Sequence, residues 1–119
     1  MAKTNSREKG KRGELEACEL LKAHGFEARR GQQYSGGGDS PDVVHNIPNT
    51  HIEVKRTEAL LLYPALEQAT RDAKDGYDPV VLHRRNGKEW VAILPAKVLL
   101  DILSEFYAGQ FKPLTKEAA

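Results

Sequence analysis

The chain has 119 residues, of which 39% are hydrophobic and 29% charged, and its formal net charge is +1. This size and composition predict one soluble globular domain and exclude a chain of two domains. The sequence has one cysteine, no signal-peptide core and no apolar run of the length that spans a bilayer. We therefore expect a cytoplasmic protein with no internal disulfide and no membrane partner.

The first helix is predicted from Lys9 to His24, after a flexible basic N-terminal arm at residues 1–8. Gly25 stands where a glycine commonly ends a helix, and Phe26 after it is expected in the core. Apolar residues recur on this helix at helical spacing, namely Leu15, Cys18 and Leu21.

Three short strands follow, predicted at residues 26–30, 41–45 and 51–56. A loop rich in glycine and serine, residues 31–40, separates the first two, and a turn at Asn46–Asn49 separates the last two. If this turn joins its two strands as a hairpin, polar side chains at their edge converge on one point.

The rest of the chain is predicted to form a helix at 63–74, a hairpin of strands 80–84 and 89–94, and a helix at 95–106. The element order is therefore αβββαββα, an α/β protein without internal repeats. The apolar last helix is interpreted as core or as a dimer interface. The chain divides into the arm, a single folded domain and a polar tail, at residues 1–8, 9–109 and 110–119.

Three polar residues on the second and third strands carry the candidate chemistry. Asp42 begins one strand and Glu53 lies on the next, while Lys55 shares a face with Glu53 about 7 Å further along. Phosphodiester hydrolysis needs oxygen ligands for a hard cation such as Mg²⁺ and a group that positions water, and this set supplies both. Glu14 on the first helix is a candidate for a second metal or for the attacking water. The structural alternative is a surface Glu–Lys pair, but clustered acids repel one another unless a cation joins them.

Pro41-Asp42 with Glu53-Val54-Lys55 resembles the signature of the PD-(D/E)xK nuclease superfamily. Within it, the chain resembles the archaeal-type Holliday junction resolvases and their phage-encoded relatives, on the segment from Lys9 to Glu16, on Gly25-Phe26 before Arg29-Arg30 and a Gly/Ser loop, and on Ile52 to Thr57. The resemblance implies a restriction-endonuclease-like core (αβββαβ), with a mixed central sheet flanked by helices, and a homodimer.

The resemblance, with the pattern above, assigns roles to further residues. Asp42 and Glu53 are expected to bind Mg²⁺, or Mn²⁺ in its place, with the backbone carbonyl of Val54 as a third ligand and no organic cofactor. Gln68 is either a residue facing the site or an ordinary exposed glutamine, and His51 is interpreted as a surface histidine at a strand end. Candidate DNA contacts flank the site or lie in the glycine loop, at Lys11, Arg12, Arg30, Ser35, Ser40 and Arg56.

The predicted function is a Mg²⁺-dependent, structure-selective DNA endonuclease that resolves four-way (Holliday) junctions. A restriction-like, nicking or repair nuclease would use the same chemistry on other DNA. A DNA-binding module without catalysis is the alternative from a different class, in which the acids only form salt bridges.

Overall fold

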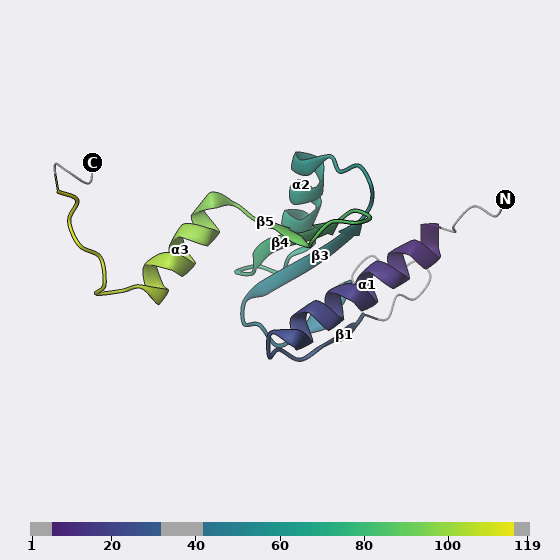
Figure 1. The fold of residues 1–119 in the computed structure, drawn as a ribbon, viewed down its shortest axis with the longest axis horizontal. Coiled ribbons are helices and arrows are strands. Elements are labelled where there is room, and N and C mark those ends of the chain that lie inside the picture. The colour runs from purple at the N-terminus through teal and green to yellow at the C-terminus, as the bar shows by residue number, and fades with distance from the viewer. Residues whose placement is uncertain (1–5, 32–41, 116–119) are drawn as a thin grey trace.

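The computed structural model of the chain describes residues 6–31 and 42–115 (Figure 1). The elements follow in the order α1 (Ser6–Ala23), β1 (Ala28–Arg30), β2 (Val43–His45), β3 (Thr50–Arg56), α2 (Leu62–Asp72), β4 (Asp78–Arg84), β5 (Val91–Ile93) and α3 (Ala96–Phe106). This order of helices and strands is the one predicted, although α1 begins at Ser6 rather than at Lys9.

The strands form two ladders. β3 and β4 pair in parallel along their whole length, from Thr50 opposite Asp78 to Arg56 opposite Arg84, with α2 as the crossover between them. β5 pairs antiparallel with β4, which confirms the hairpin predicted around Asn86-Gly87. β1 and β2 form a separate antiparallel pair.

The predicted hairpin of the second and third strands is therefore wrong as a ladder. β2 pairs with β1, and β3 pairs only with β4. The two strands nevertheless stay neighbours, because the carboxylate of Asp42, just before β2, accepts a hydrogen bond from the backbone N–H of Val54 in β3. The Asp42 carboxylate thus accepts the hydrogen bond that a backbone carbonyl of a neighbouring strand would otherwise accept from Val54 of β3.

Two helices cover opposite faces of the β3–β4–β5 sheet. Small residues of α1 pack with β2, β3 and β4 in one buried cluster, made of Ala17, Cys18, Leu21, Val43, Ile52 and Leu82. α2 builds the second cluster on the other face, from Ala65, Ala69 and Val81. Since β3 lies between the two helices, every second side chain of β3 faces α1 and the others face α2.

The end of α1 follows the sequence prediction, but Phe26 does not. Gly25 has φ of +91°, and the N–H groups of Gly25 and Phe26 donate to the carbonyls of Lys22 and Leu21, which is a Schellman cap. The turn leaves Phe26 41% exposed rather than in the core.

α3 extends away from the sheet and its two covering helices, on the far side of the body from the start of α1 (Figure 1). Val98 is its buried residue. Its other apolar side chains are exposed, including Leu100 at 61%, Ile102 at 52% and Phe106 at 72%. Of the two roles that the sequence leaves open for this helix, core or interface, the core role is excluded for most of its length. No helix in the described part of the chain is long and apolar enough to cross a membrane.

Candidate active site

The α2-facing side of β3 carries the predicted site. Glu53 and Lys55 lie on this side with His51, while Ile52 and Val54 pack toward α1. Glu53 is only 5% exposed. A carboxylate is rarely buried so deeply without a charged or hydrogen-bonding partner, so this position needs a chemical reason.

Asp42 reaches the same strand from its open edge. Its Oδ2 accepts a hydrogen bond from the Val54 N–H at 2.9 Å. In a strand, the N–H and C=O of one residue point to the same side, so the Val54 carbonyl lies on the edge that Asp42 occupies. Asp42 therefore lies beside β3 at Val54 and close enough to Glu53 for its charge to raise the pKa of that carboxyl.

The surroundings of Glu53 disfavour the ionised form of its carboxyl group. Burial, together with the negative charges of Asp42 and Asp72, raises the pKa of Glu53 to about 8. His51 Nε2 lies 2.8 Å from Glu53 Oε1, and burial lowers the pKa of this histidine. The two groups thus share one hydrogen bond, and both pKa shifts disfavour the charged forms of the pair.

Lys55 and Gln68 form the second polar contact of the site. The Lys55 Nζ donates to Gln68 Oε1 at 2.8 Å, so Gln68 on α2 faces the site and is not an ordinary exposed glutamine. Among the contacts of the described residues, Lys55 is bound by this amide and not by Glu53. The ammonium group therefore keeps its charge available for a ligand.

Glu14 also lies in the site region but is engaged by an arginine. It is 7% exposed, and Arg30 Nε donates to its Oε2 at 2.5 Å. Burial raises the pKa of Glu14, and Asp42 adds to this while Arg30 opposes it. The effect of the Asp42 charge on Glu14 indicates that α1 brings a further carboxylate toward the β2–β3 edge.

Sequence reasoning missed two residues of the site. His51 is no surface histidine, because its side chain is 10% exposed and bonded to Glu53. Asp72, in the last turn of α2, acts on the pKa values of both Glu53 and His51. The sequence spacing could have indicated Asp72, because residues four apart lie on the same face of a helix and Asp72 follows Gln68 at that spacing.

Some of the candidate DNA-contact residues are exposed, whereas others are paired with acids inside the protein. Lys11 and Arg12 are exposed on α1. Arg30 is paired with Glu14, and Arg56, only 13% exposed, is paired with Glu16. Ser35 and Ser40 lie outside the described residues.

The donor set fits a small hard cation. Among the described residues, no three His, Cys, Asp or Glu side chains form a complete cage for a metal ion. Mg²⁺ does not require one, since it usually keeps several waters and binds through one or two carboxylates plus substrate phosphates. Asp42 and Glu53, two carboxylates whose repulsion a cation would relieve, match that preference.

The raised pKa of Glu53 predicts how stability depends on pH in EDTA. The folded chain keeps this proton up to about pH 8, whereas the unfolded chain loses it near the ordinary glutamate pKa of 4.5. Stability from this group is therefore fully present below 4.5 and is lost as pH rises to about 8, by up to ~1.4 kcal/mol per pH unit. Denaturant unfolding from pH 5 to 8.5 should show this loss, and Glu53→Gln should flatten it. An equal slope in both proteins would contradict the assignment.

Comparison with known proteins supports the fold. No protein-family model and no curated protein sequence matches the chain. Among solved structures, it is similar to Hjc of Archaeoglobus fulgidus, a Holliday junction resolvase from an archaeal hyperthermophile. The TM-score is 0.55 and the sequence identity 24%, over 70% of this chain and 74% of that one. The chain thus has the α/β fold of an archaeal Holliday junction resolvase, as the sequence resemblance implied.

Proposed function

We propose that the chain is a Mg²⁺-dependent, structure-selective DNA endonuclease that resolves four-way junctions by paired phosphodiester hydrolysis. The observation that carries this proposal is the buried Glu53 beside Asp42, with Lys55 on the same face of β3. A carboxylate whose pKa is raised this far by burial and a neighbouring acid is typical of a functional site.

Asp42, Glu53 and the Val54 carbonyl would hold Mg²⁺, or Mn²⁺ in its place. When bound, the ion polarises the scissile phosphate and lowers the pKa of water. Glu53 would bind the ion as a carboxylate, and the His51 ring, 2.8 Å from Glu53 Oε1, would then donate its Nε2–H to it.

Lys55 is the group that meets the reacting phosphate. Its ammonium group is held in place by the Gln68 amide oxygen. From there it orients the attacking water and offsets the negative charge that grows on the phosphorane. Glu14 on α1, held by Arg30 of β1, supports the water or a second metal ion.

The test is a panel of labelled DNA substrates: four-way junction, linear duplex, flap and single strand, each with Mg²⁺ or with EDTA. Paired symmetric cuts in the junction, dependent on Mg²⁺, are expected. Equal cutting of linear duplex would instead indicate a restriction-like or repair nuclease. Junction binding without any cutting would indicate a binding module.

Paired cuts require two sites, and we propose that the protein acts as a homodimer. α3 supports this, because exposed apolar side chains on a helix are unfavourable in water. In a two-fold symmetric dimer, the α3 helices of the two copies would cover each other's apolar side chains. Its exposed residues include Leu99, Leu100, Ile102, Leu103 and Phe106.

Light scattering with size exclusion tests the role of α3. The unmodified chain is expected to elute as a dimer, and Leu103→Glu with Phe106→Glu as a monomer, because burying two carboxylates in an apolar interface is strongly unfavourable. Glu105→Lys, on the same helix, changes charge without removing apolar surface and should leave the dimer intact. A monomeric unmodified chain at micromolar concentration would contradict the proposal.

A further inference from the structure

Glu16 on α1 is the centre of a basic cluster at the end of the sheet away from α3. Its Oε2 accepts a hydrogen bond from Arg56 Nε at 3.0 Å, and its Oε1 accepts one from Arg84 Nη1 at 3.0 Å. Arg56 Nη2 also donates to Asn86 Oδ1 at 2.9 Å, and Arg84 Nε donates to the Lys88 carbonyl at 2.6 Å. These bonds fix the β4–β5 turn against α1 and β3.

The charges of Arg56 and Arg84 are therefore paired with that of Glu16, whereas neighbouring cationic side chains have no acidic partner among the described residues. The cationic side chains that line the hollows beside these arginines and form no ion pair with an acid within the described residues are Lys9 and Arg12 on α1, and Arg85 and Lys88 in the turn. Two surface hollows lie among them. One, of about 140 Å³, is lined by Lys9, Arg12, Glu16, Arg56 and Asn86.

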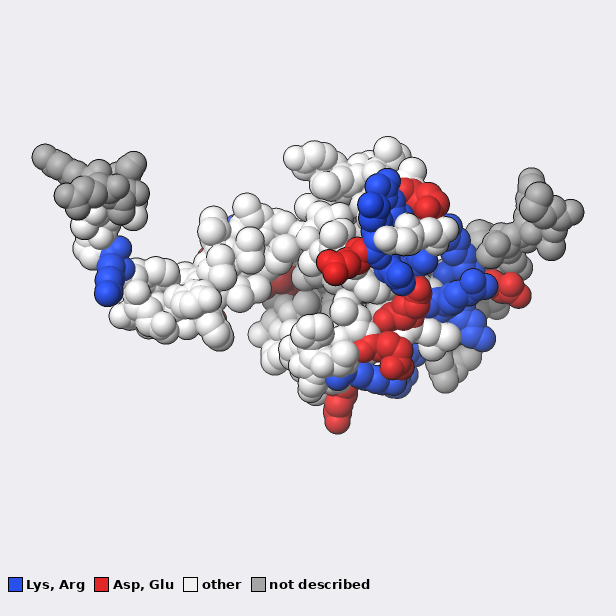
Figure 2. Space-filling view, in the orientation of Figure 1, with Lys and Arg blue, Asp and Glu red and all other residues white. Residues whose placement is uncertain are grey.

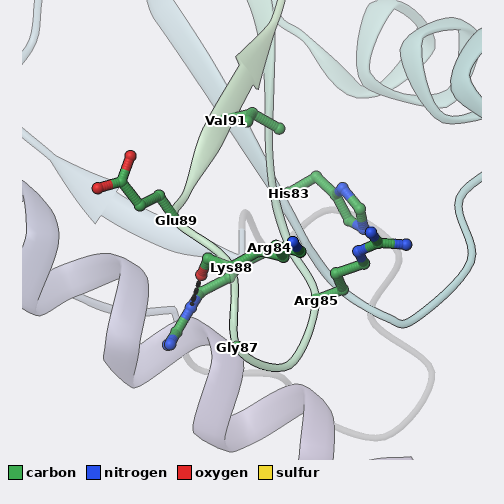
Figure 3. A pocket seen from close by; sticks show the side chains of 7 residues that line it. All are labelled: His83, Arg84, Arg85, Gly87, Lys88, Glu89 and Val91. Carbon is green, nitrogen blue, oxygen red and sulfur yellow. Dashed lines mark hydrogen bonds between the residues drawn. The ribbon is translucent and has the colours of Figure 1, made fainter.

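The second hollow, of about 450 Å³, lies over the turn and is lined by His83, Arg84, Arg85, Gly87, Lys88, Glu89 and Val91 (Figure 3). Figure 3 shows His83 and Arg85 on one side of the turn and Glu89 on the other. In the space-filling view, Lys and Arg side chains gather over this end of the molecule (Figure 2). Unpaired guanidinium and ammonium groups around open hollows favour a ligand with several negative charges in a row.

The position of the turn relative to β3 identifies that ligand. His83 is the register partner of Lys55, and Arg85 follows two residues later, where the chain leaves β4 for the turn. Two residues of a strand span about 7 Å, close to the axial rise of two nucleotides in duplex DNA at about 3.4 Å each. A DNA strand whose phosphate sits at Lys55 would therefore continue over the turn.

We propose that Arg85 and Lys88, with Lys9 and Arg12, form a phosphate-backbone site for the DNA strand that leaves the active site, and that Glu16 holds Arg56 and Arg84 as its scaffold. This inference rests on the proposed function, since it takes DNA as the ligand. It also changes the expected role of Arg56 from a phosphate contact to a positioning residue.

The test compares Arg85→Ala/Lys88→Ala with the unmodified full chain. Binding to a labelled four-way junction is measured by fluorescence anisotropy in EDTA, from 50 to 200 mM salt. The slope of log K against log salt is negative, and loss of two phosphate contacts should make it less steep by about 1.8. Binding at 0.1 M salt should weaken by about 10-fold or more. Thermal unfolding should be unchanged, because both side chains are on the surface.

The matched control is Lys22→Ala/Lys74→Ala, which removes the same charge far from the turn. Lys22 lies at the other end of α1 from Arg12, about 15 Å away along the helix axis. The control should keep the unmodified slope; an equal loss in both variants, or none in Arg85→Ala/Lys88→Ala, would overturn the inference.

The binding assay separates this inference from the proposed function. A chain that cuts no DNA but shows the predicted change in slope would refute the nuclease and retain the phosphate site. A chain that cuts junctions while Arg85→Ala/Lys88→Ala binds as tightly as before would do the reverse. A chain that binds no DNA would refute both.

Discussion

Asp42→Asn is expected to lower the rate of four-way-junction cleavage by about 10³-fold or more while junction binding is retained. Asparagine keeps a carbonyl oxygen that can accept the Val54 N–H, so the contact between β2 and β3 persists. What it removes is the negative charge next to Glu53. The loss should therefore appear in the chemical step and not in folding or in binding.

Single-turnover cleavage with Mg²⁺ measures this effect, with junction binding measured in EDTA. Glu67→Gln on α2 is the control, because Glu67 is an exposed carboxylate and its removal should leave the rate unchanged. A rate within a factor of about two for Asp42→Asn, far from the effect expected of a lost metal ligand, would end the assignment of the site.

Gly13→Ala is expected to destabilise the protein by about 1–3 kcal/mol, the range for overpacking a tight contact. A Cβ at this position would lie 2.4 Å from the Cβ of Arg56, an atom fixed to the backbone of β3. Either α1 or β3 must then move. Because α1 carries Glu14 and Glu16, the shift should also reduce cleavage.

Gly10→Ala, on the same helix, is expected to stabilise the protein rather than destabilise it. Nothing lies within 4 Å of a Cβ built at Gly10, so only the helix preference of alanine remains, which stabilises by about 0.5–1 kcal/mol. Urea unfolding of the two variants should therefore give shifts of opposite sign. Equal shifts would mean that the close approach of α1 to β3 is not as described.

The elements that are local in sequence were predictable. Alternation along 51–56 correctly placed Glu53 and Lys55 on one face, and Gly25 correctly marked the end of the first helix. Each of these depends on a period or a backbone conformation that one segment determines alone. The restriction-endonuclease-like fold followed from the resemblance.

The errors concern contacts between distant segments. A short turn favours pairing of the strands on either side of it, but β2 pairs with β1 because Asp42 occupies the edge of β3 that β2 would need. The roles of His51 and Asp72 depend on where the crossover helix lies over β3, and no local pattern specifies that. The pairing of Arg56 with Glu16 depends likewise on how closely α1 approaches, which Gly13 permits.

The bond from the Val54 amide to Asp42 gives the site its own spectroscopic probe. Most amides of a parallel sheet bond to a neighbouring strand and report on the ladder, whereas this one reports on a single carboxylate. Its proton chemical shift and its rate of hydrogen exchange should therefore follow events at Asp42 while the amides shared between β3 and β4 stay constant. One backbone resonance, assigned once, thus distinguishes a change at the edge between β2 and β3 from a change of the whole fold.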